Sequence, residues 1–368
     1  MKRRIGWIFC GVAIVTAVSV AAAAQTSPSV RCDGSFHLTR RFTRGRNTFV
    51  QEPAYAAGKL WLIENYFDHT GDLRQSLKSW DGMTWSTEPI PRPQDGQYYI
   101  RALDVTDDGV AWLAGSHQAA ETRAIVLRWD GTSWQSTAVP ALGPDSSLAD
   151  IDMWSSQDGW AVGHYEAGEQ ESALTLRWNG SAWQHVDSPG NGAGELRSVS
   201  IASQDDVWAV PIGGRRRATI RWDGTTWTRY DLPRSRGRIL QPFDVDAVRA
   251  NRAWISGWWE RRRTVGAVLA WDGSRWSARR SVNRRGLTFL LAIDGGPGGW
   301  AVGETRTKKD RSPVALRKVG GRWERTAVDD GVQRHLNGVV DVAGTAWATG
   351  GGASKKQGLY GVLAEACT

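Results

Sequence analysis

Short stretches of alternating apolar and polar residues recur along the chain after its N-terminal region, and none keeps the 3.6-residue period of a helix. In the third repeat unit these stretches are 148–153, 159–165, 173–178 and 183–186. Asn179 and Gly180 join the last two stretches, and because both residues tolerate positive φ, the pair predicts a two-residue hairpin turn. The pattern therefore predicts four short antiparallel strands in each unit.

Tryptophan marks the same positions in every unit. One tryptophan stands in the second stretch of each unit, at 61, 112, 160, 208, 254, 300 and 347. A second motif, Trp-Asp-Gly-x-x-Trp, follows at 80–85, 129–134, 222–227 and 271–276, with Asn for Asp at 178–183 and a degraded copy at 318–323. Together the two motifs use 18 of the 22 tryptophans. We interpret these 18 as side chains that fill the space between neighbouring sheets.

Seven units of four strands predict an all-β fold, a seven-bladed β-propeller. The expected blades are about 47–91, 97–140, 145–189, 194–233, 238–282, 286–328 and 333–368. The last unit lacks a fourth strand, whereas 30–39 contains a shortened motif, Cys-Asp-Gly-Ser-Phe, in which Phe36 replaces the closing tryptophan. We therefore expect the N-terminal strand to complete blade seven and close the ring, in a single domain over 25–368.

Residues 1–24 have the pattern of a secretory signal peptide. Lys2–Arg4 precede an apolar run, and Ala22–Ala24 predict cleavage before Gln25. A retained membrane anchor is the alternative, because the run is just long enough to span a bilayer. Export would place the two remaining cysteines, Cys32 and Cys367, in a compartment where disulfides persist. We expect a secreted or extracytoplasmic protein whose chain ends are joined by a disulfide; the alternative is two unpaired buried thiols.

The two motifs also resemble known repeats. The segments DGWAVG at 158–163 and RWDGTSW at 128–134 are similar to the repeats of exported bacterial β-propellers and of photosystem II assembly-factor propellers. They resemble kelch and sialidase Asp-box repeats more distantly, because the sialidase box has one more residue between Asp and Gly. The resemblance covers essentially residues 30–368. It implies the propeller fold and little about chemistry.

Charge divides the chain into two halves. Residues 25–196 contain 13 Lys and Arg against 22 Asp and Glu, whereas residues 197–368 contain 30 against 16. In a closed ring, blades one to three are then acidic and blades four to seven basic. Basic runs stand in the second-to-third-strand loops of blades four to seven and in the connections between blades. Both kinds of loop emerge on one face of a propeller, which we call the loop face.

We predict an anion-binding surface on the loop face of blades four and five, because the planar fork of arginine suits carboxylate, sulfate and phosphate. Tryptophans beside these arginines add a stacking surface. The residues assigned to this surface are Arg215, Arg216, Arg217, Trp258, Trp259, Arg261, Arg262, Arg263, Arg284 and Arg285. The expected partner of this monomer is an anionic glycan, a wall polymer or an acidic protein. Nucleic acid would satisfy the same charges, but export and the lack of a binding module argue against it.

Catalytic chemistry has weaker support. The six histidines show no metal-ligand spacing and no serine lies in a nucleophile elbow, so we expect no metal and no cofactor. A hydrolase or lyase of anionic polysaccharides would use Asp150, Asp244, His117 or His164. Aspartates recur eight or ten residues before the blade tryptophan, however, which favours a structural role. We therefore favour a non-catalytic binding scaffold, with that enzyme and an assembly partner of another extracytoplasmic protein as alternatives.

Overall fold

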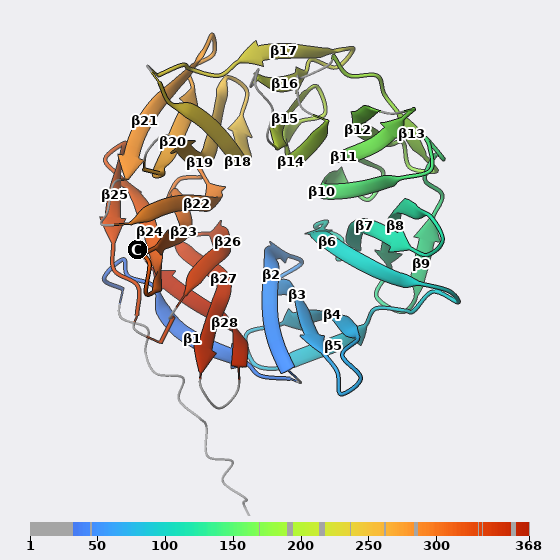
Figure 1. Cartoon of the computed structure of the whole chain (residues 1–368), viewed down its shortest axis with the longest axis horizontal. Helices are drawn as coiled ribbons and strands as arrows, with labels where there is room; N and C mark the ends of the chain where they lie inside the picture. The colour runs from blue at the N-terminus through green and yellow to red at the C-terminus, as the bar shows by residue number, and fades with distance from the viewer. Residues whose placement is uncertain are drawn as a thin grey trace, which may run out of the picture. The chain divides into compact units, whose positions relative to one another are not determined.

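The structure is a computed structural model that describes residues 32–44, 46–168, 170–189, 194–212, 218–235, 237–260, 263–282, 286–329, 331–332, 334–354 and 358–367. The expected signal segment, 1–24, lies outside these residues. Arg31–Thr368 form one compact unit. The described residues contain no helix, and so none of the length and apolarity needed to cross a membrane. They form seven four-stranded antiparallel sheets arranged in a ring (Figure 1).

The fold is the predicted seven-bladed β-propeller, and each sheet is one blade. The inner strands are β2 (Arg46–Ala56), β6 (Gln97–Val105), β10 (Ser146–Ser155), β14 (Glu195–Ser203), β18 (Ile239–Arg249), β22 (Leu287–Asp294) and β26 (His335–Val342). The second strands are β3 (Lys59–Phe67), β7 (Ala111–Gln118), β11 (Asp158–Ala167), β15 (Asp206–Ile212), β19 (Arg252–Glu260), β23 (Trp300–Arg306) and β27 (Thr345–Ser354).

Strand order within each blade follows the sequence, from the inner strand to the rim. The third strands are β4 (Leu73–Trp80), β8 (Thr122–Trp129), β12 (Gln170–Trp178), β16 (Ala218–Trp222), β20 (Val265–Trp271), β24 (Arg311–Val319) and β28 (Gly358–Cys367). The outer strands are β5 (Trp85–Pro89), β9 (Trp134–Thr137), β13 (Trp183–His185), β17 (Trp227–Asp231), β21 (Trp276–Val282), β25 (Arg322–Thr326) and β1 (His37–Phe42).

The ring closes as predicted, through the N-terminal strand. β1 pairs with β28 and becomes the outer strand of blade seven, in the sheet order β1-β28-β27-β26. The disulfide joins Cys32 to Cys367, and the N–H of Gly34 donates to the carbonyl of Cys367 at 3.2 Å. Phe36 is fully buried and lies 4.8 Å from Trp300, in the place of a closing tryptophan. Such a disulfide is typical of an oxidising, extracytoplasmic compartment.

Tryptophans form the cores between blades, which confirms the structural role predicted for the 18 repeated ones. The described residues form seven hydrophobic clusters, one at each interface between blades, and every repeated tryptophan belongs to one. Trp160 of blade three, for example, lies 5.0 Å from Trp222 and 4.8 Å from Trp227 of blade four, measured between ring centroids. Tilted and edge-to-face rings at this spacing attract each other beyond the area they bury.

The turn between the third and outer strands is longer than predicted. Trp178 pairs with Trp183, so the loop is the four residues 179–182, and only Gly180 has positive φ. The side-chain oxygen of Asn179 accepts hydrogen bonds, each of 3.0 Å, from the backbone N–H groups two and three residues further on. The prediction of a two-residue turn was wrong because the side chain of Asn179, rather than a second residue of positive φ, closes the loop.

We predict that replacing one of these tryptophans destabilises the whole ring. Trp160 is 1% exposed, so Trp160→Ala should lower the free energy of unfolding by about 3–5 kcal/mol. Trp154 lies outside the repeat and is 49% exposed, so Trp154→Ala should change it by less than about 0.5 kcal/mol. Chemical denaturation of both variants measures the difference. Equal losses would contradict the assignment of Trp160 to the core between blades.

Candidate functional site

Four cavities of the described residues lie on the loop face or open toward it. A cleft of about 850 Å³ lies between blades six and seven, and cavities of about 420 and 350 Å³ lie over blades one to three. A fourth cavity, of about 280 Å³, occupies the central channel. The walls of the first three are the second-to-third-strand loops, the connections between blades and the strand ends on that side, whereas the inner strands line the channel cavity. Binding on this face is therefore favoured by shape as well as by charge.

Most of the arginines predicted to bind anions on blades four and five lie outside the described residues. They are Arg215, Arg216, Arg217, Arg261, Arg262, Arg284 and Arg285. Arg263 is exposed at the start of the segment that leads into β20. Trp259 is 4% exposed and packs in the core between blades four and five, so Trp258, which is half-buried, is the tryptophan available for stacking.

Trp258 is the centre of a row of aromatic rings between two arginines. Its ring lies 5.5 Å from Phe243 and 5.1 Å from Phe289, and its indole N–H donates to Glu260 at 3.1 Å. The Arg197 guanidinium lies 3.5 Å from the Phe243 ring centroid, and that of Arg306 lies 4.7 Å from the Phe289 centroid. Arg197 lines the central channel and Arg306 lines the cleft between blades six and seven, so the row connects these two cavities.

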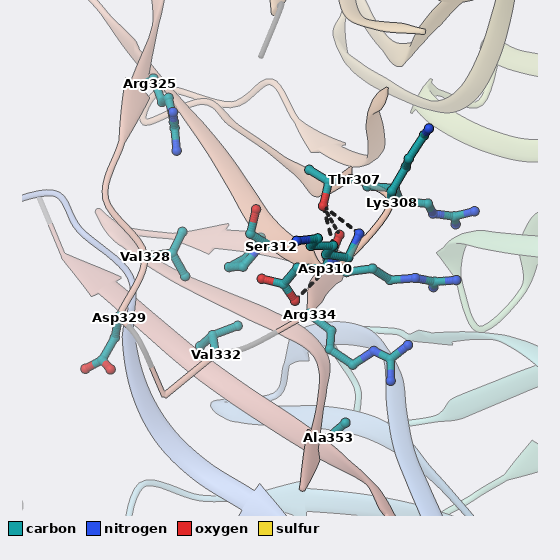
Figure 2. A pocket seen from close by; sticks show the side chains of 14 residues that line it. Thr307, Lys308, Asp310, Ser312, Arg325, Val328, Asp329, Val332, Arg334 and Ala353 are labelled. Atoms are coloured by element: carbon teal, nitrogen blue, oxygen red, sulfur yellow. Dashed lines mark hydrogen bonds between the residues drawn. The ribbon is translucent and has the colours of Figure 1, made fainter. Parts of the chain in front are cut away.

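The cleft between blades six and seven is strongly basic, and we call it the basic cleft. Its cationic residues are Arg306, Lys308, Lys309, Arg311, Arg325 and Arg334. One wall is the β23–β24 loop, in which Thr307 accepts hydrogen bonds from the backbone N–H groups of Asp310 (3.0 Å) and Lys309 (3.3 Å) (Figure 2). The opposite wall includes Val328 and Val332, which add apolar surface (Figure 2).

Carboxylates near the basic cleft neutralise only part of its charge. Glu304 is 2% exposed and forms ion pairs with Arg306 and Arg311. Asp310 accepts a hydrogen bond from the backbone N–H of Arg311 at 2.8 Å. Asp329 accepts one from the N–H of residue 331 at 2.6 Å, and its side chain points away from the β23–β24 loop (Figure 2). Six cations against three carboxylates leave the cleft net positive.

The basic cleft also lies where the chain closes on itself. The N–H of Phe36 donates to Ala327 at 3.0 Å, and the N–H of Asp329 donates back to Phe36 at 2.8 Å. The N-terminal segment therefore fixes the wall formed by the blade six–seven connection. The sequence had marked basic runs in blade six, but it could not show that Arg325 and Arg334, distant in sequence from the run at 306–311, line the same cleft.

The catalytic candidates Asp150 and Asp244 are held in hydrogen bonds between blades. Asp150 accepts from the N–H groups of Val199 and Ile151, each at 2.8 Å. Asp244 accepts from the N–H of Ile293 at 2.8 Å and from the hydroxyl of Ser198 at 2.7 Å. Both oxygens of Asp244 and one oxygen of Asp150 thus join neighbouring inner strands, and the other oxygen of Asp150 accepts within its own strand. This arrangement favours a structural role for the recurring aspartates.

The same bond recurs around the channel. Asp104, Asp152, Asp246 and Asp294 each accept a hydrogen bond of 2.5–2.7 Å from a backbone N–H in the next inner strand or, for Asp246, from Gly295 directly after it. Burial is the main cause that raises the pKa of Asp104 to about 6 and that of Asp246 to about 7. Burial likewise raises the pKa of Asp150 to about 7 and that of Asp244 above its usual range.

The two candidate histidines lie on the loop face but do not approach these aspartates. His117 Nε2 lies 2.7 Å from the carbonyl oxygen of Asp95. His164, Glu171 and Glu195 bring potential ligand atoms within 4.8 Å of one another. Arg101 already donates to Glu195 at 3.1 Å. His164 Nδ1 lies 3.9 Å from Glu195, so Glu195 is shared between Arg101 and His164.

Comparison with solved structures gives the same architecture. "YCF48 bound to D1 peptide" matches at 13% identity and a TM-score of 0.58, over 90% of this chain and 95% of that chain. "YCF48 from Cyanidioschyzon merolae" matches at 14% identity and a TM-score of 0.54, over 89% and 98%. The shared property is the fold. YCF48 is a photosystem II assembly factor, one of the groups that the repeats resemble, whereas the likeness to kelch and sialidase repeats stays a prediction. No protein-family model and no curated protein matches the sequence.

We predict that the channel aspartates make stability depend on pH. Because burial raises their pKa, the folded protein binds protons that the unfolded chain has lost. Their contribution to the free energy of unfolding is complete below pH 3.8 and is lost as the pH rises through about 7. The melting temperature should therefore fall over this interval. Asp246→Asn keeps an acceptor oxygen but cannot titrate, so the stability that this variant loses between pH 3.8 and 7 should be smaller than the wild-type loss by up to about 4 kcal/mol.

Scanning calorimetry across pH measures this effect, and the turn aspartates supply a matched control. Backbone N–H groups hold the pKa of Asp130 below its usual range, so its titration lies below this interval. The third unit has Asn179 at the equivalent position, so Asp130→Asn should fold and keep the wild-type pH profile. Identical profiles for Asp246→Asn and the wild type would contradict the account.

Proposed function

We propose that this protein is an exported, monomeric, non-catalytic binding scaffold whose basic cleft holds an extended acidic segment of a partner protein. The observation that carries the proposal is the cleft itself, a cavity of about 850 Å³ with six cationic side chains at the seam between blades six and seven. That volume lies in the range of ligand-binding clefts. The Cys32–Cys367 disulfide agrees with a partner outside the cytoplasm.

Three cations of the basic cleft are available to a partner. Among the described residues, Lys308, Lys309 and Arg334 form no side-chain hydrogen bond or ion pair. Both lysines are exposed, and Arg334 is half-buried beside Val332. A carboxylate placed here would gain charge-assisted hydrogen bonds without breaking a pair that already exists. The basic cleft thus contains positive charges that are not neutralised by ion pairs within the protein.

A protein segment fits the basic cleft better than a glycan or a wall polymer. Val328 and Ala353 supply apolar contacts between the cations, which suits a chain that alternates acidic and apolar side chains. The similar YCF48 structure is described as bound to a D1 peptide, which supports a peptide ligand for this fold. The arginines predicted on blades four and five extend the same loop face. Trp258 and Arg263 belong to that extension in this proposal.

We predict that a fluorescently labelled peptide of alternating Glu and Leu binds the purified protein, and that its affinity falls as salt is raised above about 0.15 M, because exposed charges are screened. Lys308→Glu combined with Lys309→Glu should weaken binding at least about tenfold, a loss of about 1.4 kcal/mol. Fluorescence anisotropy measures both effects.

The control variant makes the same change of charge elsewhere. Arg279 and Arg280 are adjacent, exposed residues on β21, the outer strand of blade five. Arg279→Glu combined with Arg280→Glu should leave affinity for the peptide within about twofold of the wild type, because these residues lie outside the basic cleft. Equal losses in the two double variants would contradict the proposed site. Tighter binding of a heparin oligosaccharide than of the peptide would replace the protein partner with a glycan.

A further inference from the structure

Every inner strand is interrupted by a β-bulge at the same level of the channel. At this level one residue of the inner strand has no partner in the register with the second strand in six blades, and in blade one two adjacent residues have none; β2, β10, β14 and β18 have a second irregularity elsewhere. The unpaired residues are Glu52 with Pro53, Arg101, Ala149, Arg197, Phe243, Leu291 and Asn337. All of them line the channel cavity of about 280 Å³. Bulges aim side chains away from the regular pleat and are frequent beside binding sites.

The bulge residues form a ring with one position from each blade, and their identities do not repeat. The surrounding strands keep the same tryptophans and aspartates, whereas the ring contains an acid, two arginines, an amide and three apolar side chains. Because blade order fixes positions in the ring, Glu52 lies across the channel from Arg197, with Arg101 and Asn337 on either side of Glu52. Phe243 and Leu291 form an apolar arc next to Arg197.

Glu52 is held in an unfavourable state. Its φ is 51°, in the left-handed region that costs a residue other than glycine about 1–3 kcal/mol. Among the described residues, its carboxyl group has no hydrogen bond and no ion pair. Burial within the channel, together with Asp150 of β10 and Asp244 of β18, raises its pKa to about 8, against the opposing effect of Arg197 and Arg101. A residue with a strained backbone whose carboxyl group has no partner in a cavity is typical of a ligand-binding site.

Arg197 is the complementary group. Its guanidinium carbon lies 3.5 Å from the Phe243 ring centroid, a cation–π contact that stabilises the position of the guanidinium. Within the described part of the chain, its donors form no hydrogen bond and no ion pair. Arg101 donates to Glu195 through one nitrogen and keeps further donors on the channel side. The cavity therefore contains the Arg197 guanidinium on one side and the unpaired carboxyl of Glu52, with Arg101 next to it, on the other.

We propose that the central channel is a second binding site, distinct from the basic cleft, for a small zwitterion with an apolar side chain, such as an apolar α-amino acid. The ligand carboxylate would bind Arg197, its ammonium group would bind Glu52 beside Asn337, and its side chain would contact Phe243 and Leu291. This assignment satisfies both unpaired groups at once. It also matches the charge of the cavity, where carboxyl groups and guanidinium groups nearly balance.

Calorimetric titration of the purified protein with three isosteric probes tests the assignment. The probes are L-leucine, 4-methylpentanoate, which lacks the ammonium group, and 3-methylbutylamine, which lacks the carboxylate. L-leucine should bind, and each analogue should bind at least about tenfold more weakly, because a buried charge-assisted hydrogen bond is lost. Absence of L-leucine binding, or equal binding of either analogue, would overturn the proposal.

Variants separate this site from the basic cleft. Arg197→Gln and Glu52→Gln should each weaken L-leucine binding at least about tenfold, and melting curves show whether each variant folds. Lys308→Glu combined with Lys309→Glu should bind L-leucine as the wild type does. Loss of L-leucine binding in that double variant, or its retention in folded Arg197→Gln, would contradict two separate sites. Each proposal can therefore fail without the other.

The pH dependence supplies an independent readout of Glu52. An ammonium group favours the ionised acid, so the affinity for L-leucine should rise several-fold as the pH is raised from about 6 to about 8. Asp150 and Asp244 face Glu52, and their ionisation with rising pH also favours binding of the ammonium group. Arg101 and Arg197 stay charged over this range, so they do not contribute to the pH dependence. Glu52→Gln should reduce this dependence. Affinity that falls with rising pH would contradict ammonium binding at Glu52.

Discussion

The packing of indole rings between neighbouring blades is the interaction on which the rest of this structure depends. A four-stranded sheet of this size cannot bury both faces alone, so each blade is stable only against its neighbours. Trp208 of blade four lies 4.9 Å from Trp271 and 5.1 Å from Trp276 of blade five, measured between ring centroids. Tryptophan rings also meet between blades two and three, three and four, five and six, and seven and one, and Phe36 makes the contact between blades six and seven. Loops far apart in sequence meet on one face for this reason.

The scaffold and the recognising residues are separated within each repeat. Tryptophans and inter-blade aspartates recur because every blade must meet the next in the same way. The residues at the bulges and in the loops vary because they lie in the channel or on the loop face and do not pack against the neighbouring blade. The proposed cleft and channel sites both lie in this variable set. The carboxyl groups of Asp104 and Asp246 join the blades, but their burial raises their pKa. These aspartates therefore make the protein less stable as the pH rises.

The sequence predicted the number of blades, the closing strand and the disulfide because each follows from a fixed period and one missing strand. It did not predict the four-residue turns, because the side chain of Asn179 replaces a second residue of positive φ. Nor did it predict the basic cleft, which combines Lys309 with Arg334 across two blades. The ring of bulges was also missed, because alternation of apolar and polar residues does not show which residue leaves the pleat. Glu52 shows this most clearly, because nothing in the sequence pattern indicates that its φ is 51°.

A double-mutant cycle between Trp208 and Trp276 tests the inter-blade packing most directly. Their rings meet edge to face, at 80°, across the boundary between blades four and five. Denaturation of the two single variants and the double variant, each with leucine in place of tryptophan, gives their interaction free energy. The account predicts a coupling of about 0.5–1.5 kcal/mol. Strictly additive losses would contradict the claim that tryptophans of adjacent blades hold the ring together.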